Sequence, residues 1–142
     1  MSKKSGNINA LIEPFRGQCH DAHYLGYFDC FNRQLFYEAH DVLEELWLGD
    51  RHGADGDFYK GLIQLAGAFV HIQKNRRGPA QALFKLARAN LGKYPTRHHD
   101  LELAAVASLI ADWSARVEMQ LEIRALISSG FPPKLDLISR PK

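Results

Sequence analysis

Apolar residues recur roughly every three or four positions along most of the chain, which is the spacing of one face of an α-helix. The clearest case is residues 35–48, whose apolar stripe is followed by Gly49, a residue type that commonly ends helices. The same spacing predicts helices over residues 21–32, 79–91 and 100–128. No segment carries the signals of a β-strand, so we predict an all-α fold.

Residues 58–74 differ from the other segments because they are apolar almost all the way round. A helix of this kind has no face for solvent, so we predict that it lies at the centre of a helical bundle. Its few polar residues, among them Gln64 and His71, fall on one narrow stripe beside Gly67 and Ala68. Small residues at that position would let a neighbouring helix approach closely.

The two ends of the chain lack this periodicity. We predict an N-terminal arm over residues 1–18 and one single-domain bundle of about five helices over residues 19–130. Residues 131–142 are predicted to form an extended tail, because the consecutive prolines Pro132 and Pro133 exclude a helix and favour extended geometry.

Three polar stretches receive a structural interpretation only. In the loop over residues 49–56 the spacing of the aspartates does not fit a calcium-binding loop, so we expect Asp55 or Asp57 to cap the next helix. Residues 18–23 contain one cysteine and two histidines, which we interpret as a solvated helix start. His98 and His99 are expected to lie in a turn and to have no function.

Composition narrows the class of protein. The chain has 142 residues, of which 46% are hydrophobic and 24% charged, as in an ordinary globular domain. The net charge of +2 gives no general argument for nucleic acid or for a membrane surface. No apolar run reaches the roughly 20 residues that span a bilayer. With two cysteines, Cys19 and Cys30, and no hydrophobic leader, we expect a cytoplasmic protein without disulfides.

The most chemically informative feature is a predicted polar cluster. His40 and Glu44 stand one helical turn apart, and an adjacent helix would bring Gln64 and His71 to them. The four groups could simply satisfy one another, with Glu44 bonded to His40 and Gln64 to His71. Alternatively, His40, Glu44 and His71 could bind a divalent metal such as zinc, iron or manganese. Only three strong ligands are present and the paired Glu-x-x-His motifs of di-iron bundles are missing, so we expect no cofactor.

Charge is distributed unevenly. Residues 74–99 contain seven basic residues and no acid, whereas residues 38–57 contain seven acids and one base. The basic segment 74–97 could bind RNA or phosphate through Arg77, Lys85 and Arg88. No aromatic residues interleave with these charges as in a nucleic-acid motif, so we favour charge complementarity within the chain or across a homodimer.

Several motifs together resemble DUF309, an uncharacterised family of small helical proteins. They are Phe31-Asn32, Glu38-Ala39-His40-Asp41-x-x-Glu44-x-x-Trp47, Gly61-Leu62-Ile63-Gln64, His71 and Pro132-Pro133. The resemblance covers about Leu25 to Leu135 and implies an all-helical fold, with His40, Glu44, Gln64 and His71 as marked positions. It implies no activity.

One position departs from the family pattern, which usually has Glu where this chain has Asp41. Helical spacing places Asp41 and Glu38 on a flank that faces water, away from His40, so we expect the change to leave the cluster undisturbed.

We therefore expect a non-enzymatic helical module, a homodimer, whose polar cluster is structural or binds a small ligand. The first alternative is a metal-dependent hydrolase with His40, His71 and Glu44 as ligands and Gln64 orienting a water molecule. The second alternative is a module that binds RNA or phosphate through the basic segment 74–97.

Overall fold

A computed structural model describes residues 8–129 and 132–138, and within these residues the fold is almost wholly helical, which confirms the predicted all-α class. The elements follow in the order α1 (Ile8–Ile12), η1 (Glu13–Phe15), α2 (Ala22–Asn32), α3 (Phe36–Asp50), α4 (Gly56–Gln73), α5 (Arg77–Leu91), β1 (Arg97–His98), β2 (Leu101–Glu102), α6 (Leu103–Met119) and η2 (Ile123–Ser129), where η marks a 3-10 helix. Along the described residues, none of the helices combines the length and apolar composition that crossing a membrane requires.

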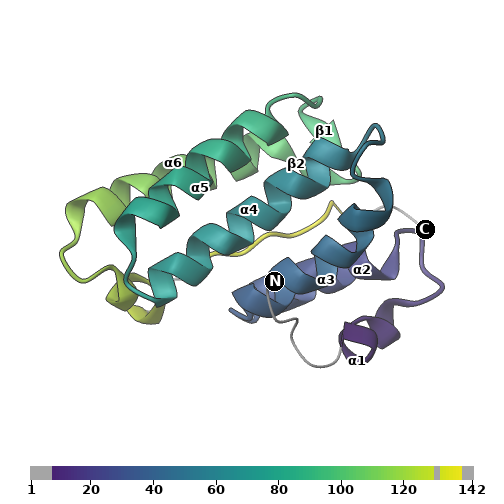
Figure 1. Cartoon of the computed structure of the whole chain (residues 1–142), viewed down its shortest axis with the longest axis horizontal. Helices are drawn as coiled ribbons and strands as arrows, with labels where there is room; N and C mark the ends of the chain where they lie inside the picture. The colour runs from purple at the N-terminus through teal and green to yellow at the C-terminus, as the bar shows by residue number, and fades with distance from the viewer. Residues whose placement is uncertain (1–7, 130–131, 139–142) are drawn as a thin grey trace.

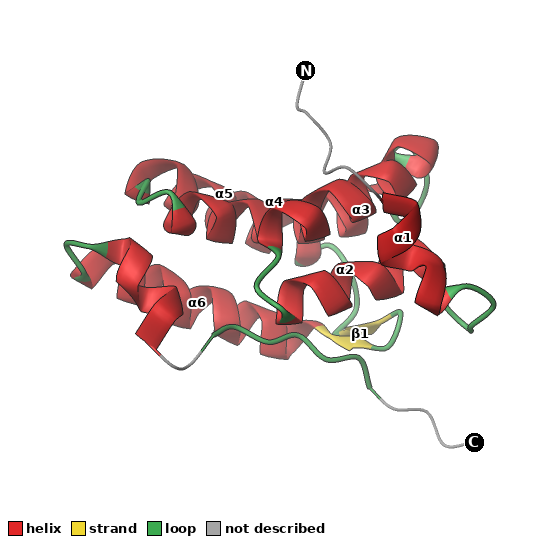
Figure 2. Ribbon diagram, turned by 90° about the horizontal axis from the view of Figure 1, so that it is seen from below, coloured by secondary structure: helices red, strands yellow, loops and turns green. Residues whose placement is uncertain are grey.

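The long helices form two layers. Helices α3, α4 and α5 lie side by side in one layer, with α4 in the middle, and α2 and α6 form the second layer (Figures 1 and 2). The central position of α4 agrees with its apolar composition, because buried residues occur on nearly every side of this helix.

Aromatic side chains join the two layers. Phe69 of α4 stacks on Phe36 of α3 with ring centroids 5.0 Å apart. It also makes edge contacts with Phe31 of α2, Phe84 of α5 and Trp113 of α6, at centroid distances of 5.5, 5.4 and 5.1 Å. The Phe69 ring therefore contacts every other long helix, and edge-to-face geometry of this kind is favourable beyond the area that it buries.

The last part of the chain differs from its prediction in two ways. The helix expected over residues 100–128 begins at Leu103 and ends at Met119, because the backbone of Gln120 is extended. The predicted absence of strands was also wrong, since β1 and β2 form a short antiparallel hairpin. Its strands have two residues each, which is too short for an alternating pattern to appear in the sequence.

Part of the N-terminal arm is ordered against the bundle. Residues 8–15, which we predicted to be irregular, form α1 and η1. Ile8 and Ile12 are buried against Val42 of α3 in a small apolar cluster. Residues 1–7 of the predicted arm lie outside the described residues.

The C-terminal tail is held in part by one side chain of α2. Residues 132–138 contain no helix or strand and lie along the α2 and α6 layer (Figure 2). The Leu135 amide donates to Asn32 Oδ1 at 2.7 Å, and Asn32 Nδ2 donates to the Leu135 carbonyl at 2.8 Å. Leu135 itself is buried in the core. The tail therefore completes the fold. Asn32 supplies two of the hydrogen bonds that fix it, and the Ile138 amide donates a further one to the Asp100 carbonyl at 2.7 Å. Residues 131 and 139–142 lie outside the described part.

Asn32→Ala is expected to lower the free energy of unfolding by about 1–3 kcal/mol, because it leaves the part-buried amide and carbonyl of Leu135 without their partner. Urea unfolding measures the loss, and the Leu135 amide should exchange its hydrogen faster than in the unmodified chain. Asn9→Ala, at an exposed position of α1, is the matched control and should change stability by less than about 0.5 kcal/mol. Unchanged exchange at Leu135 would contradict the assigned role of Asn32.

Candidate functional site

A pocket of about 320 Å³ lies between α3, α4 and α5. It has apolar walls with a few polar groups, as small-molecule sites usually have. The pocket is lined by Tyr37, His40, Ile63, Gln64, Gly67, Val70, His71, Lys74 and Leu83. Three of the four residues in the predicted cluster, His40, Gln64 and His71, therefore share one pocket, whereas Glu44 does not line it.

His40 reaches the pocket from α3, where Asp41 sets the orientation of its ring. His40 Nδ1 lies 3.0 Å from Asp41 Oδ1, which is a hydrogen-bond distance. His40 Nε2 lies 3.7 Å from Glu44 Oε2, which is too long for a hydrogen bond but close enough for an ion pair when the ring is protonated. Asp41 is therefore the nearer partner, and Glu44, one turn later, is the weaker one.

The burial of Asp41 corrects the sequence prediction. We expected Asp41 to face water, but its side chain is fully buried, with 0% exposure. Val42, the next residue, packs against Ile8 and Ile12 of α1. Because Asp41 bonds directly to His40, the replacement of Glu by Asp at this position does bear on the cluster. Glu38, on the same flank, is partly buried.

Two other residues of the DUF309-like motifs, Phe31 of α2 and Trp47 of α3, belong to the core. Phe31 is fully buried, and Trp47 is partly buried and packs against the main apolar cluster. Both side chains therefore support the walls of the bundle and are not in the pocket.

Gly61 and Gly67 of α4 face α5. A Cβ atom built on Gly61 would lie 2.8 Å from Leu91 Cγ, so only glycine allows this approach of the two helices. A Cβ atom on Gly67 would lie 3.1 Å from Leu83 Cδ1. Consistent with this packing, Gln64 Oε1 accepts a hydrogen bond of 2.8 Å from Asn90 Nδ2 of α5, in place of the predicted bond to His71.

His71 has no polar partner for one of its ring nitrogens. Its Nδ1 is buried and makes no hydrogen bond with any of the described residues. Burial lowers the pKa of the imidazole, and the positive charges of Arg76 and Lys74 lower it further. The ring is therefore neutral at neutral pH. A buried N–H without an acceptor is costly, so the unpartnered Nδ1 is assigned as the lone-pair nitrogen and Nε2 carries the hydrogen.

The predicted metal ligands are not gathered around one point. Within residues 8–129 and 132–138, the group of three possible ligands whose donor atoms all lie within 4.8 Å of one another is Asp55, His98 and His99. His40, Glu44 and His71 do not form such a group. Metal binding by these three residues stays a prediction.

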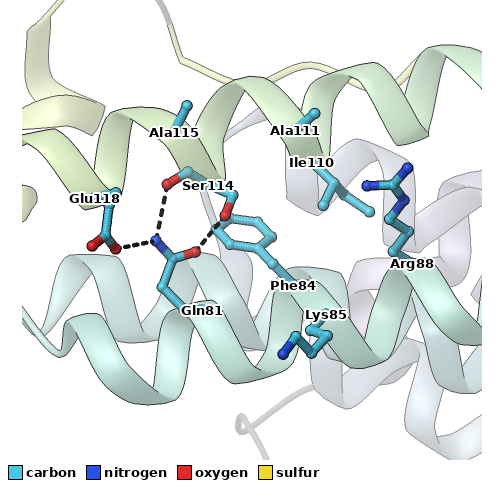
Figure 3. Close-up of a pocket in the computed structure, with 9 residues that line it drawn as sticks. All are labelled: Gln81, Phe84, Lys85, Arg88, Ile110, Ala111, Ser114, Ala115 and Glu118. Carbon is cyan, nitrogen blue, oxygen red and sulfur yellow. Dashed lines mark hydrogen bonds between the residues drawn. The ribbon is translucent and has the colours of Figure 1, made fainter.

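The basic residues proposed for RNA or phosphate have different surroundings. Lys85 and Arg88 line a groove of about 570 Å³ between α5 and α6 (Figure 3). Arg77 Nε instead donates to the Val117 carbonyl at 2.9 Å, which ties α5 to α6. The groove also contains the carboxylate of Glu118, bonded to Gln81, and this negative charge opposes a phosphate ligand. Binding of RNA or phosphate stays a prediction.

The acidic and basic segments lie on opposite sides of the central helix. Helix α3 carries much of the acidic segment and α5 much of the basic one, with α4 between them (Figure 1). A lysine–aspartate pair also connects the two segments, because Lys93 Nζ lies 2.8 Å from Asp57 Oδ2. The homodimer that we predicted from these charges stays a prediction.

Sequence reasoning missed one cluster. His98 and His99, expected to have no function, each place Nε2 2.7 Å from a different oxygen of Asp55. Burial acts to raise the pKa of the Asp55 carboxyl, but the hydrogen bonds from both histidines lower it more, so the pKa lies below its usual value. A pair of adjacent histidines is the only signal in the sequence, and the position of Asp55 follows from the tertiary fold alone.

Comparison with known proteins agrees with the resemblance seen in the sequence. Residues 24–83 match the model of a family described as "Domain of unknown function (DUF309)". We call residues 24–83 the DUF309 segment, because they are similar to that family. No match was found among curated proteins or among solved structures. The DUF309 segment runs from α2 into α5, so it is shorter than the expected resemblance and does not include the Pro132-Pro133 tail. It contains all nine residues that line the pocket of α3, α4 and α5.

Proposed function

We propose that the chain is a helical module that binds a small molecule in the pocket between α3, α4 and α5. The proposed ligand has an apolar body and a group that accepts hydrogen bonds, such as a carboxylate or a phosphate. The observation that carries the proposal is the convergence of His40, His71 and Lys74 on one pocket with apolar walls. Polar atoms of a structural network normally satisfy one another, and this cluster does not close into such a network.

The hydrogen-bonding pattern of the cluster supports this choice over a purely structural one. His40 bonds to Asp41, and Gln64 bonds to Asn90. These two polar residues of the pocket are therefore held by partners that do not line it. His71 does not make the bond to Gln64 that a structural network was expected to contain. Its assigned Nε2–H is a donor for a ligand, and a second histidine lines the same pocket.

The charge and shape of the pocket support the proposed class of ligand. Ile63, Val70 and Leu83 supply apolar walls, and Lys74 adds an exposed positive charge to the lining. The volume of about 320 Å³ is at the lower end of the range for small-molecule sites. A molecule with one ring and one acidic group matches that volume and these contacts.

The proposal includes a reducing compartment such as the cytoplasm. Cys19 and Cys30 are both free thiols, and burial raises the pKa of the Cys30 thiol to about 11. Such a thiol is poorly reactive, which agrees with a packing role.

The experiment uses benzoate, indole-3-acetate and phenyl phosphate as probes, with benzamide as the uncharged comparison. We expect the acidic probes to produce saturable NMR shifts of amides in α3, α4 and α5 and of the His71 ring. His71→Phe keeps a ring of similar size but removes the donor, so binding should weaken by about tenfold or more, which is what losing a hydrogen bond to a charged group costs.

Two further variants test whether the probes bind in the pocket or on another surface of the molecule. Gly67 of α4 lines the pocket, so the larger side chain of Gly67→Val narrows it and should weaken the binding of all the probes. His52→Phe makes the same change at an exposed loop position and should leave binding unchanged. The proposal fails if no probe produces saturable shifts around the pocket, or if His71→Phe and Gly67→Val bind as the unmodified chain does.

A further inference from the structure

We propose that Asp55, His98 and His99 form a second site, which binds a divalent transition metal ion. This site lies at the hairpin end of the molecule, where the loop before α4 meets the turn between β1 and β2. It is separate from the pocket of α3, α4 and α5, because none of its three residues lines that pocket. The inference does not rest on the function proposed for the pocket.

The backbone of the hairpin brings two adjacent imidazoles to the same carboxylate. Neighbouring residues in a strand normally point to opposite faces. Here His99 and Asp100 both have positive φ, at 48° and 61°, so the chain turns sharply after His98. The rings of His98 and His99 therefore lie on the same side, with centroids 4.3 Å apart. Tyr24 holds this turn by donating its hydroxyl to the His99 carbonyl at 2.9 Å.

Asp55 is available for this role because another residue caps α4. We expected Asp55 or Asp57 to cap the helix, and Asp55 does occupy the N-cap position, but its side chain makes no capping hydrogen bond. The hydroxyl of Tyr94 instead accepts from the Phe58 amide at 2.9 Å and donates to the Ala54 carbonyl at 2.8 Å. The carboxylate of Asp55 is thus directed at the two histidines.

Two imidazole nitrogens and one carboxylate oxygen are a common ligand set for zinc and for non-haem iron. The three donor atoms already lie within 4.8 Å of one another. Ligand atoms around a tetrahedral zinc ion lie about 3.3 Å apart, so the histidines and Asp55 would separate by roughly half an ångström from their hydrogen-bonded positions. The His99 side chain is 37% exposed, which leaves space for that movement and for water in the remaining coordination positions.

A second His–Asp pair lies beside the site and provides an internal control. His20 Nε2 lies 2.9 Å from Asp100 Oδ2, and the His20 ring is 6.4 Å from the His99 ring. His20 has the same type of partner as His98 but is not one of the three converging ligands. Replacing His20 therefore tests whether a histidine that lies near the site, but is not a ligand, contributes to metal binding.

The test uses the full chain without a histidine tag, stripped with chelator and titrated with Zn²⁺ by calorimetry and with Co²⁺ by visible absorption. We expect one ion per chain. Asp55→Asn, His98→Gln and His99→Gln should each weaken binding by more than about tenfold, the smallest loss seen when only a supporting partner of a metal ligand is removed. His20→Gln, Cys19→Ser and the double variant His40→Gln/His71→Gln should bind within about twofold of the unmodified chain, since they leave all three ligands in place.

If Asp55→Asn fails to fold, a second measurement on the unmodified chain shows which histidines bind the metal. One equivalent of Zn²⁺ should shift the ring nitrogen resonances of His98 and His99 and leave those of His40 and His71 in place. The proposal is overturned if binding is substoichiometric, or if the variants of Asp55, His98 and His99 bind normally. It is also overturned if His40→Gln/His71→Gln loses the metal while His98→Gln retains it, because that result assigns the metal to the other cluster.

Discussion

Phe69→Ala is expected to lower the free energy of unfolding by about 3–5 kcal/mol, the range for removing a large aromatic side chain from a core. Phe69 is fully buried, and its ring contacts aromatic side chains from α2, α3, α5 and α6. The substitution therefore removes contacts with four helices at once and leaves a cavity where the layers meet. Urea unfolding followed by circular dichroism measures the change.

Two control variants test whether the loss of stability is specific to the Phe69 ring or follows from replacing any large apolar residue. Phe69→Leu keeps much of the side-chain volume and should cost clearly less than Phe69→Ala. Leu86→Ala removes a large apolar side chain that is 49% exposed on α5, so it should cost less than about 1 kcal/mol. A loss below about 1 kcal/mol for Phe69→Ala would show that Phe69 does not have the central role assigned here.

Asp41→Ala is expected to lower the free energy of unfolding by about 2–3 kcal/mol, which is the upper range for a hydrogen bond to a charged group. The carboxylate is fully buried and bonds to His40 Nδ1 at 3.0 Å. Its loss leaves His40 without its nearer partner and frees the ring to rotate in the pocket lining. Chemical unfolding gives the stability change, and the NMR signals of the His40 ring report its orientation.

The conservative variant and an exposed acid test this explanation. Asp41→Asn has nearly the same shape and can still accept a hydrogen bond from His40, so its cost should be smaller than that of Asp41→Ala. Glu45→Ala removes an exposed acid from the same helix and should change stability by less than about 1 kcal/mol. Equal losses for Asp41→Ala and Glu45→Ala would contradict the burial of Asp41.

The long helices could be predicted because each one carries its own signal. Apolar spacing placed α2, α3 and α5 within two residues of their observed ends, and the all-round apolar character of residues 58–74 identified α4 as central. The hairpin and the end of α6 were not predictable in this way. The two-residue strands carry no period, and no glycine or proline marks the end of α6 at Met119.

The candidate site was predictable only in part, for a related physical reason. Helical spacing identified His40, Gln64 and His71 as inward-facing, but it could not say which neighbour covers each flank of a helix. Asp41 was therefore expected in water, although its side chain is fully buried. The partner of Gln64 is Asn90, which follows the DUF309 segment, and the meeting of Asp55 with His98 and His99 joins residues more than 40 positions apart.

The position of α5 has a consequence for work with shortened forms of this protein. The segment that matches DUF309 ends at residue 83, inside α5, which continues to Leu91. A fragment limited to that segment would be cut in mid-helix and would lack the rings of Phe84 and Trp113 that pack on Phe69. We therefore expect the smallest unit able to fold independently to be longer than the segment that matches the family, and to extend at least through α6.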